Sequence, residues 1–103
     1  MTASREDIIA ALKTVFDPEV PVNIWDMGLV YDIRMSDTVV DITMTFTSPT
    51  CPMMDDIVAQ VKNVVTAATG VDTNVILVWE PKWDLSRMSD AARIELDLTE
   101  QGW

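Results

Sequence analysis

A stripe of hydrophobic positions at helical spacing predicts a helix near the start of the chain. Ser4 precedes the stripe and Asp7 follows three residues later, which predicts an N-cap with an imperfect capping box. Because the residue before a proline disfavours helical backbone, we expect this helix to end before Pro18. The stripe consists of Ile8, Ile9, Leu12, Val15 and Phe16.

Two segments of alternating polarity then predict a half-buried antiparallel hairpin. The first strand is expected to open at Gly28, and residues 35–38 make the turn. On the first strand, one face carries Leu29, Tyr31, Ile33 and Met35. On the second strand, one face carries Val40, Ile42, Met44 and Phe46, and the other carries Asp41, Thr43, Thr45 and Thr47.

Three further segments complete the pattern. A second helical stripe ends before Gly70, which is placed to adopt left-handed backbone after the helix. Residues 75–79 form an unbroken apolar run, which predicts a strand covered on both faces. Ser89 is expected to cap a short last helix. The second stripe consists of Met54, Ile57, Val58, Val61, Val64, Val65 and Ala68, and the last helix carries Ala91, Ala92, Ile94 and Leu96.

The order helix, hairpin, helix, strand, helix predicts a single two-layer α+β domain over residues 1–103. The second strand, the following helix and the third strand form a crossover, so these two strands should run parallel. The expected fold is a small mixed sheet covered by helices, in which an antiparallel hairpin gains one strand parallel to its second strand.

This topology should bring separate loops to one edge of the sheet. The loops that hold Cys51 and Pro81 both follow parallel strands, whose carboxyl ends favour binding sites. The first strand is antiparallel to the second, so its start brings Asp26 to the same edge, with Asp17 and Glu19 preceding it. We therefore expect three loops to surround Cys51.

Composition narrows the function. The net charge of the 103 residues is −10, and a surface that acidic repels nucleic acid and anionic lipid. No segment approaches the length of a membrane span, and no apolar signal run opens the chain. The single cysteine and the absence of histidine exclude an internal disulfide and Ser–His–Asp or Cys–His catalysis, and favour a cytoplasmic protein.

Cys51 is the only strong nucleophile and the only soft metal ligand of the chain. It lies just before a predicted helix, where the helix dipole favours a thiolate, and Pro52 is acceptable in the first turn. Asp55 and Asp56 oppose that effect, so we expect a modestly activated thiol. The alternative is a buried structural cysteine.

Other residues of these loops are candidates for the same pocket. Hydroxyls of Thr47, Ser48 and Thr50 would hydrogen-bond a thiolate or a bound anion, although turn chemistry explains them nearly as well. Asp17 and Glu19 offer hard ligands for iron or orient a partner, and the alternative of a helix end and a solvated side chain is favoured for this pair.

Two tryptophans bracket the last loop. Trp83 and Pro81 are expected to dock a partner, because exposed aromatics are frequent in binding surfaces; the alternative is that Trp83 covers a sheet edge. Trp79 is expected to complete the core strand. A resident iron–sulfur cluster needs about four soft ligands, and this chain has one. We therefore expect no stably bound cofactor, but transient contact of iron or a cluster with Cys51.

Three motifs together resemble those of a family of small iron–sulfur assembly factors, typified by SufT and PaaD. They lie within residues 17–33, 44–53 and 78–93, and they contain Asp-Pro-Glu-Val-Pro, Thr-Ser-Pro-Thr-Cys-Pro-Met and Trp-Glu-Pro-Lys-Trp respectively. The resemblance covers nearly the whole chain. It implies that the reactive cysteine of the family falls on Cys51, the acidic pair on Asp17 and Glu19, and a Thr-Ser step on Thr47 and Ser48.

Departures from the family pattern are modest. Trp25 and Met27 replace smaller or branched residues, and Lys82 replaces a proline that is common there. PaaD-type members carry a cysteine-bearing C-terminal extension, whereas this chain ends at Trp103, so it is more similar to the stand-alone SufT branch.

The resemblance implies an accessory factor in iron–sulfur protein maturation rather than an enzyme. Its partners would be assembly machinery or client apoproteins, with no nucleic acid and no membrane, and it would form a homodimer. Two alternatives remain open: a thiol-based redox or persulfide-transfer enzyme, and an interaction adaptor that does not use Cys51.

Overall fold

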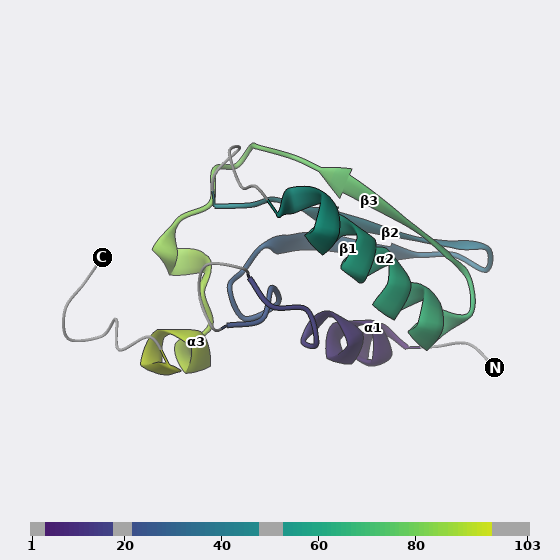
Figure 1. Ribbon diagram of the computed structural model, residues 1–103, viewed down its shortest axis with the longest axis horizontal. Helices are drawn as coiled ribbons and strands as arrows, with labels where there is room; N and C mark the ends of the chain where they lie inside the picture. Colours follow the sequence, from purple (N-terminus) through teal and green to yellow (C-terminus); the bar gives the residue numbers. More distant parts are fainter. Residues whose placement is uncertain (1–3, 18–21, 48–52, 96–103) are drawn as a thin grey trace.

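A computed structural model of the chain describes residues 4–17, 22–47 and 53–95. The predicted α+β fold and its element order are confirmed (Figure 1). A 3-10 helix, η1, lies between the last strand and the last helix and was not predicted. The elements are α1 (Arg5–Leu12), β1 (Val30–Met35), β2 (Val39–Met44), α2 (Met54–Thr69), β3 (Asp72–Leu77), η1 (Leu85–Arg87) and α3 (Asp90–Glu95).

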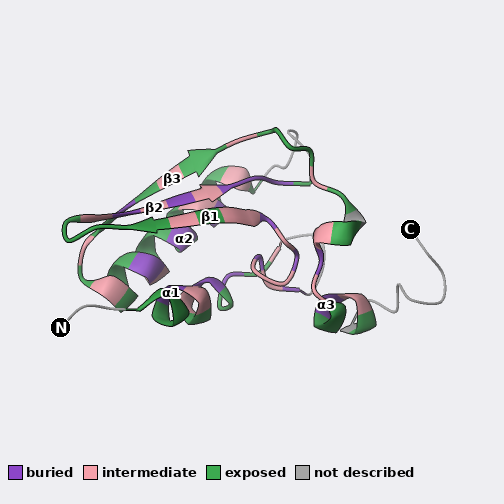
Figure 2. Ribbon diagram, turned by 180° about the vertical axis from the view of Figure 1, so that it is seen from behind, coloured by how far each residue is buried: buried purple, intermediate pink, exposed green. Residues whose placement is uncertain are grey.

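The three strands form one mixed sheet in the order β1-β2-β3. β1 pairs with β2 antiparallel, and β2 pairs with β3 parallel, as the crossover predicts. Helices α1 and α2 cover one face of the sheet (Figure 1), and the opposite face is open among the described residues (Figure 2). The open face is polar where the three strands meet: Asn74 donates a hydrogen bond to the Asp41 carboxylate at 3.2 Å.

The core lies between the sheet and the two helices. The predicted inner face of β2 is buried through Val40, Ile42 and Met44, and Phe46 continues it beyond the strand. On α2, the central stripe is buried through Ile57, Val61 and Val65. Gly70 ends α2 with φ of 76°, so the predicted left-handed C-cap is confirmed. Ala68 is exposed, so the predicted stripe was one turn too long.

The first helix is shorter than predicted. The capping box of Ser4 and Asp7 is complete, with Ser4 N–H donating to the Asp7 carboxylate at 2.9 Å. The helix ends at Leu12, well before Pro18, because the next residues pair across the chain: Ile24 N–H donates to the Val15 carbonyl at 2.8 Å. Val15 is buried as expected, but Phe16 is 53% exposed.

The expected period of two along the first strand is broken by an irregularity. The strand begins at Val30 rather than at Gly28, and its register shifts between Val30 and Asp32. As a result Val30 and Ile33, three positions apart, both pair with inward-facing residues of β2. Tyr31 leaves the inner face and hydrogen-bonds the last loop instead. A bulge of this kind is invisible in the hydrophobic pattern.

The prediction that residues 75–79 form a strand covered on both faces is wrong. β3 runs from Asp72 to Leu77 and lies at the edge of the sheet, with β2 as its only neighbour among the described residues. Ile76 is 45% exposed and Leu77 is 37% exposed. An apolar segment can form a buried strand, but the strand is buried only if another element packs over each of its faces.

Within the described ranges, no helix is long and apolar enough to cross a membrane.

Candidate functional site

A cavity of about 330 Å³ lies where the chain leaves β2 and β3. Because these strands are parallel, their carboxyl ends meet at one edge of the sheet, as the topology predicts. The backbone pairing continues one residue past β3, since Val78 N–H donates to the carbonyl of Met44, the last residue of β2, at 2.9 Å. The cavity is lined by Thr45, Phe46, Thr47, Trp79, Glu80, Lys82 and Trp83.

The loop after β3 is hydrogen-bonded to β1 and to the turn before β1. The indole N–H of Trp83 donates to the Met27 carbonyl at 2.7 Å, and the Tyr31 hydroxyl donates to the Pro81 carbonyl at 2.8 Å. Arg87 stacks over the Tyr31 ring, with 4.6 Å from the guanidinium carbon to the ring centroid. These contacts hold one wall of the cavity in place through residues fifty or more positions apart in sequence.

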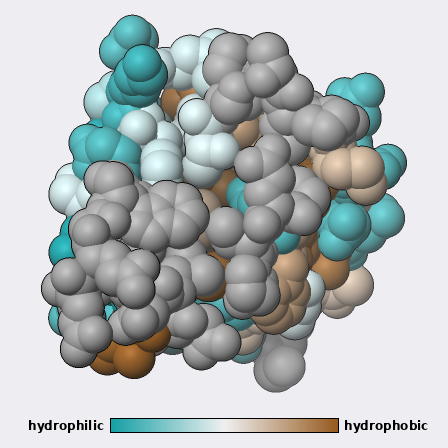
Figure 3. Space-filling model, turned by 60° about the vertical axis from the view of Figure 1, so that its left-hand side comes forward, coloured by the Kyte–Doolittle hydropathy of each residue, from teal (hydrophilic) through white to brown (hydrophobic). Residues whose placement is uncertain are grey.

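A second cavity of about 430 Å³ lies on the β1 side of this loop, between Pro81 and the start of β1. Gly28, Val30, Tyr31, Pro81 and Arg87 line it. Figure 3 views this end of the molecule, where hydrophobic residues reach the surface in patches between hydrophilic ones.

The structure brings together some of the residues predicted for the site. Thr47 and Trp83 line the first cavity, and Pro81 lines the second. Asp17 and Asp26 line neither cavity. The Asp26 carboxylate accepts a hydrogen bond from the Asn23 side chain at 2.8 Å, and its carbonyl accepts one from Ser89 N–H at 2.8 Å.

The main chain of Asp17 is also paired, because its N–H donates to the Val22 carbonyl at 3.0 Å. Four predicted site residues lie outside the described residues: Glu19, Ser48, Thr50 and Cys51. Their roles stay predictions.

The sequence predicted that Trp79 would be buried and Trp83 exposed, and the structure shows Trp79 as the more exposed of the two. Trp79 is 41% exposed, so the expectation that it completes the core is wrong. Trp83 packs against the core, and its indole N–H donates to the Met27 carbonyl. The alternative that it covers a sheet edge stays a prediction. Partner docking by Trp83 and Pro81 stays a prediction.

Sequence reasoning missed the pair of Tyr31 and Arg87 and the cavity position of Glu80. The alternation of β1 assigned Tyr31 to the core, and nothing local marks Arg87 as its partner. The unusual density of aromatic and proline residues at 79–83 was the one available signal that this loop contributes to a site.

No three His, Cys, Asp or Glu side chains of the described ranges 4–17, 22–47 and 53–95 are grouped closely enough to hold a metal ion.

Hydrogen bonds from Ser86 change the acidity of the Asp84 carboxyl. The Ser86 hydroxyl and the Ser86 N–H both donate to that carboxylate, the latter at 2.8 Å, and lower the pKa of Asp84 below its ordinary value. A carboxylate with a lowered pKa stabilises the fold above its unfolded-state pKa, and this stabilisation is lost as pH falls through the folded pKa.

We expect Ser86→Ala to raise the pKa of Asp84 toward its ordinary value, because the hydroxyl donor is the largest cause of the shift. A carboxyl NMR titration of both proteins measures this. An unchanged Asp84 midpoint would show that the hydroxyl does not stabilise the carboxylate.

The profile of a family described as iron-sulfur cluster assembly protein matches residues 5–77. This chain belongs to that family. The matched span includes α1, the whole sheet and α2, so the earlier resemblance to the SufT and PaaD type is confirmed at the level of the family.

Individual relatives agree over most of their length. The chain is 44% identical over 98 residues to the Fe-S protein maturation auxiliary factor YitW of Bacillus subtilis, covering 93% of this chain and 96% of the relative. It is 40% identical over 87 residues to the Fe-S protein maturation auxiliary factor SufT of Staphylococcus aureus, covering 82% and 99%. A crystal structure of a domain of unknown function from Bacillus anthracis has a TM-score of 0.83 at 39% identity, covering 90% of this chain and 91% of that one.

Proposed function

We propose that this protein is an accessory factor in the maturation of iron–sulfur proteins and that it contacts iron, sulfur or a cluster transiently through Cys51. The observation that carries the proposal is the family match over residues 5–77, a span that includes the only cysteine of the chain. The relatives named as Fe-S protein maturation auxiliary factors match this chain over at least 82% of its length.

The surroundings in sequence of Cys51 support this role. Thr47, four residues earlier, lines the cavity at the ends of β2 and β3, and Met53, two residues later, is the N-cap of α2. The N-terminus of a helix favours a thiolate, and the carboxylates of Asp55 and Asp56 in the first turn of α2 oppose that effect. A weakly activated thiol suits a ligand that must release its cargo.

The ligand count favours shared handling of the cargo. A cluster takes about four soft ligands, and one chain offers one cysteine. The remaining ligands would come from the assembly machinery, from a client apoprotein or from a second copy of this chain. Iron or cluster is therefore a substrate in this proposal and passes through the complex.

An anaerobic reconstitution with ferrous iron and sulfide tests the cysteine directly. We expect Cys51→Ser to remove most of the visible absorbance of the protein-bound product, because the change removes the one soft ligand that the chain offers. Asn63→Ser, on the exposed side of α2, is the matched control and should retain the wild-type absorbance. Equal absorbance of all three proteins would remove Cys51 from the proposal.

A cellular arm tests the function itself. In a host lacking its own family member, the wild-type chain and Asn63→Ser should restore the activity of iron–sulfur enzymes under iron limitation. If Cys51→Ser restores it equally, the protein acts in maturation without its thiol. If the wild-type chain restores nothing, the proposed function is wrong.

A further inference from the structure

The two edges of the sheet are protected very differently. The β1 edge carries a register shift between Val30 and Asp32, an ion pair of Arg34 with Asp32 at 2.9 Å, and a loop that hydrogen-bonds Tyr31. Bulges, charges and covering loops are the usual devices that stop an edge strand from pairing with another chain. β1 therefore has all three.

The β3 edge has neither a bulge nor a covering loop among the described residues, and its one charged residue is Asp72. Its register with β2 is unbroken over six pairs, from Val39 with Asp72 to Met44 with Leu77. The strand contains no lysine, arginine or proline, and no described element covers its outer side (Figures 1 and 2). An edge strand with regular pairing, no lysine or arginine and no covering element is suited to accept one more strand.

The backbone groups available on this edge follow from the ladder. Val78 N–H donates to the Met44 carbonyl, so residues in phase with Val78 face β2. Residues in the opposite phase direct their N–H and C=O groups outward. These are Thr73, Val75 and Leu77. They offer a row about 13 Å long, at roughly 3.3 Å per residue, for an extended segment.

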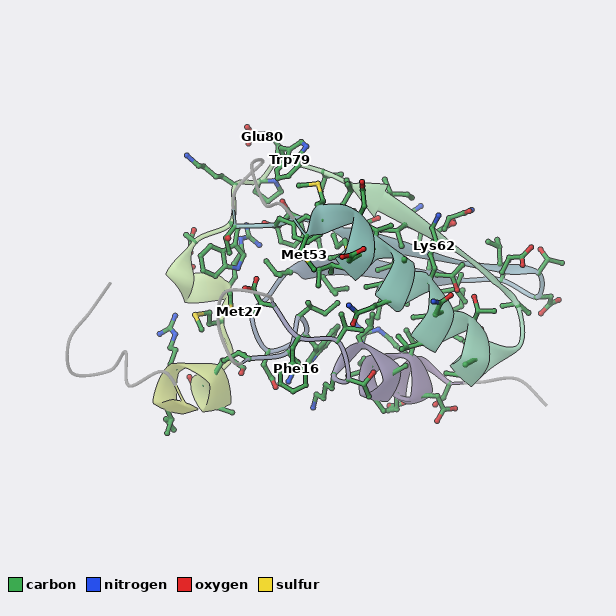
Figure 4. All side chains as sticks on the ribbon, in the orientation of Figure 1. Phe16, Met27, Met53, Lys62, Trp79 and Glu80 are labelled. Atoms are coloured by element: carbon green, nitrogen blue, oxygen red, sulfur yellow. The ribbon has the colours of Figure 1, made fainter. Side chains whose placement is uncertain are left out.

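Exposed apolar side chains flank the end of this row. Ile76, Leu77 and Trp79 are 45%, 37% and 41% exposed, and Met53, at the start of α2, is 41% exposed. Figure 4 shows Met53 at the same end of the molecule as Trp79 and Glu80. We call the outer backbone of β3 together with Met53, Ile76, Leu77 and Trp79 the β3 edge surface. It combines main-chain donors and acceptors with apolar contacts for alternate side chains.

Charge decides what kind of segment this surface accepts. Asp72 begins β3, Glu80 follows Trp79, and Asp55 and Asp56 follow Met53. In α2, β3 and the loop up to Lys82, the cationic side chains are Lys62 and Lys82. The net charge of the whole chain is −10. A second copy would bring the same acidic groups and repel, whereas a basic segment would be attracted.

We propose that the β3 edge surface binds an extended segment of a partner protein, with apolar residues at alternate positions and lysine or arginine at its ends, which pairs with β3 as a fourth strand. The proposal does not depend on Cys51 or on iron, so its failure leaves the proposed maturation role untouched. It identifies the surface by which this protein would hold a partner.

The probe is the peptide acetyl-Lys-Val-Thr-Ile-Thr-Val-Lys-amide, added to the full chain without iron or sulfide. We expect amide hydrogen exchange of Thr73, Val75 and Leu77 to slow on binding, while the inward amides of Asn74 and Ile76 are protected from the start. Affinity should fall as salt is raised. The same peptide with glutamate in place of both lysines should bind at least about tenfold more weakly.

Variants locate the site. Ile76→Lys and Leu77→Lys place a like charge beside the basic peptide and should each weaken binding by about tenfold or more. Met35→Lys adds the same charge at a residue 42% exposed on β1 and should leave binding unchanged. Each of these variants adds one positive charge, so a difference in peptide affinity between them reports the position of the charge and not its sign.

Three results would overturn the proposal. The first is no slowing of the outward β3 amides at millimolar peptide. The second is equal weakening by Met35→Lys, which would make the effect one of net charge. The third is protection of Thr73, Val75 and Leu77 without peptide that rises with protein concentration alongside a dimer in sedimentation, which would assign the edge to a second copy of this chain.

Discussion

Gly28→Ala is expected to lower the free energy of unfolding by about 3 kcal/mol or more. Gly28 has φ of 78°, where a side chain costs about 1–2 kcal/mol. A Cβ there would also lie 2.1 Å from the Arg87 carbonyl oxygen and 2.6 Å from the Arg87 carbonyl carbon. Those atoms are backbone, so the clash is relieved only by moving the loop that carries η1 away from the start of β1, and overpacking of this kind costs about 1–3 kcal/mol more.

Gly70→Ala is the matched control for that experiment. Gly70 has φ of 76°, nearly the same backbone conformation, but a Cβ there would meet nothing within 4 Å. We expect this variant to lose about 1–2 kcal/mol, from the left-handed backbone alone. Urea denaturation of both variants measures the difference. If both variants lose the same free energy of unfolding, the backbone of Arg87 does not restrict a side chain at position 28.

Trp83→Ala is expected to lower the free energy of unfolding by about 3 kcal/mol, toward the low end of the range for a large aromatic residue because Trp83 is only half-buried. The change removes the side chain that packs the last loop against the core and leaves the Met27 carbonyl without its indole donor. Both losses fall on the wall of the cavity near Thr47. Trp83→Phe should keep most of the packing and lose about 1–2 kcal/mol, from the missing hydrogen bond.

Trp79→Ala serves as the control within the same cavity. Trp79 lines that cavity too, but it is 41% exposed, so its truncation should cost less than Trp83→Ala. Thermal and urea unfolding of the three variants rank them. If Trp79→Ala destabilises the protein as much as Trp83→Ala, the loop is held by general apolar contact rather than by the anchor to Met27.

Together these two predictions describe how the cavity keeps its shape. One wall continues β2, and the other is a loop pinned at Gly28, Tyr31 and Trp83. Weakening these contacts should widen the cavity. A variant such as Trp83→Phe therefore changes the cavity wall and leaves the sequence around Cys51 unaltered.

Local pattern was a reliable guide to elements whose periodicity was long or strictly alternating. The inner face of β2, the central stripe of α2 and the cap at Gly70 follow from side-chain spacing and from the tolerance of glycine for left-handed backbone. The parallel pairing of β2 with β3 followed from the handedness and length of a strand–helix–strand crossover.

The hydrophobic pattern failed where burial depends on what lies across from a residue. The run at 75–79 is as apolar as a central strand, yet β3 lies at an edge and Trp79 is exposed. Phe16 continues a helical stripe, but the chain has already turned to pair Val15 with Ile24. A hydrophobic side chain is more stable when buried, but it becomes buried only if other elements of the fold pack against it.

The sequence alone therefore established the class of fold, the order of its elements, the meeting of two loops at one sheet edge and the family resemblance centred on one cysteine. The tertiary structure decided which tryptophan anchors the last loop, that Tyr31 faces Pro81 and Arg87, and that β3 is left open while β1 is protected. The reason is physical: backbone preferences and periodicity act between neighbours along the chain. The contacts of Trp83 with Met27 and of Gly28 with Arg87 exist only once residues more than fifty positions apart have packed.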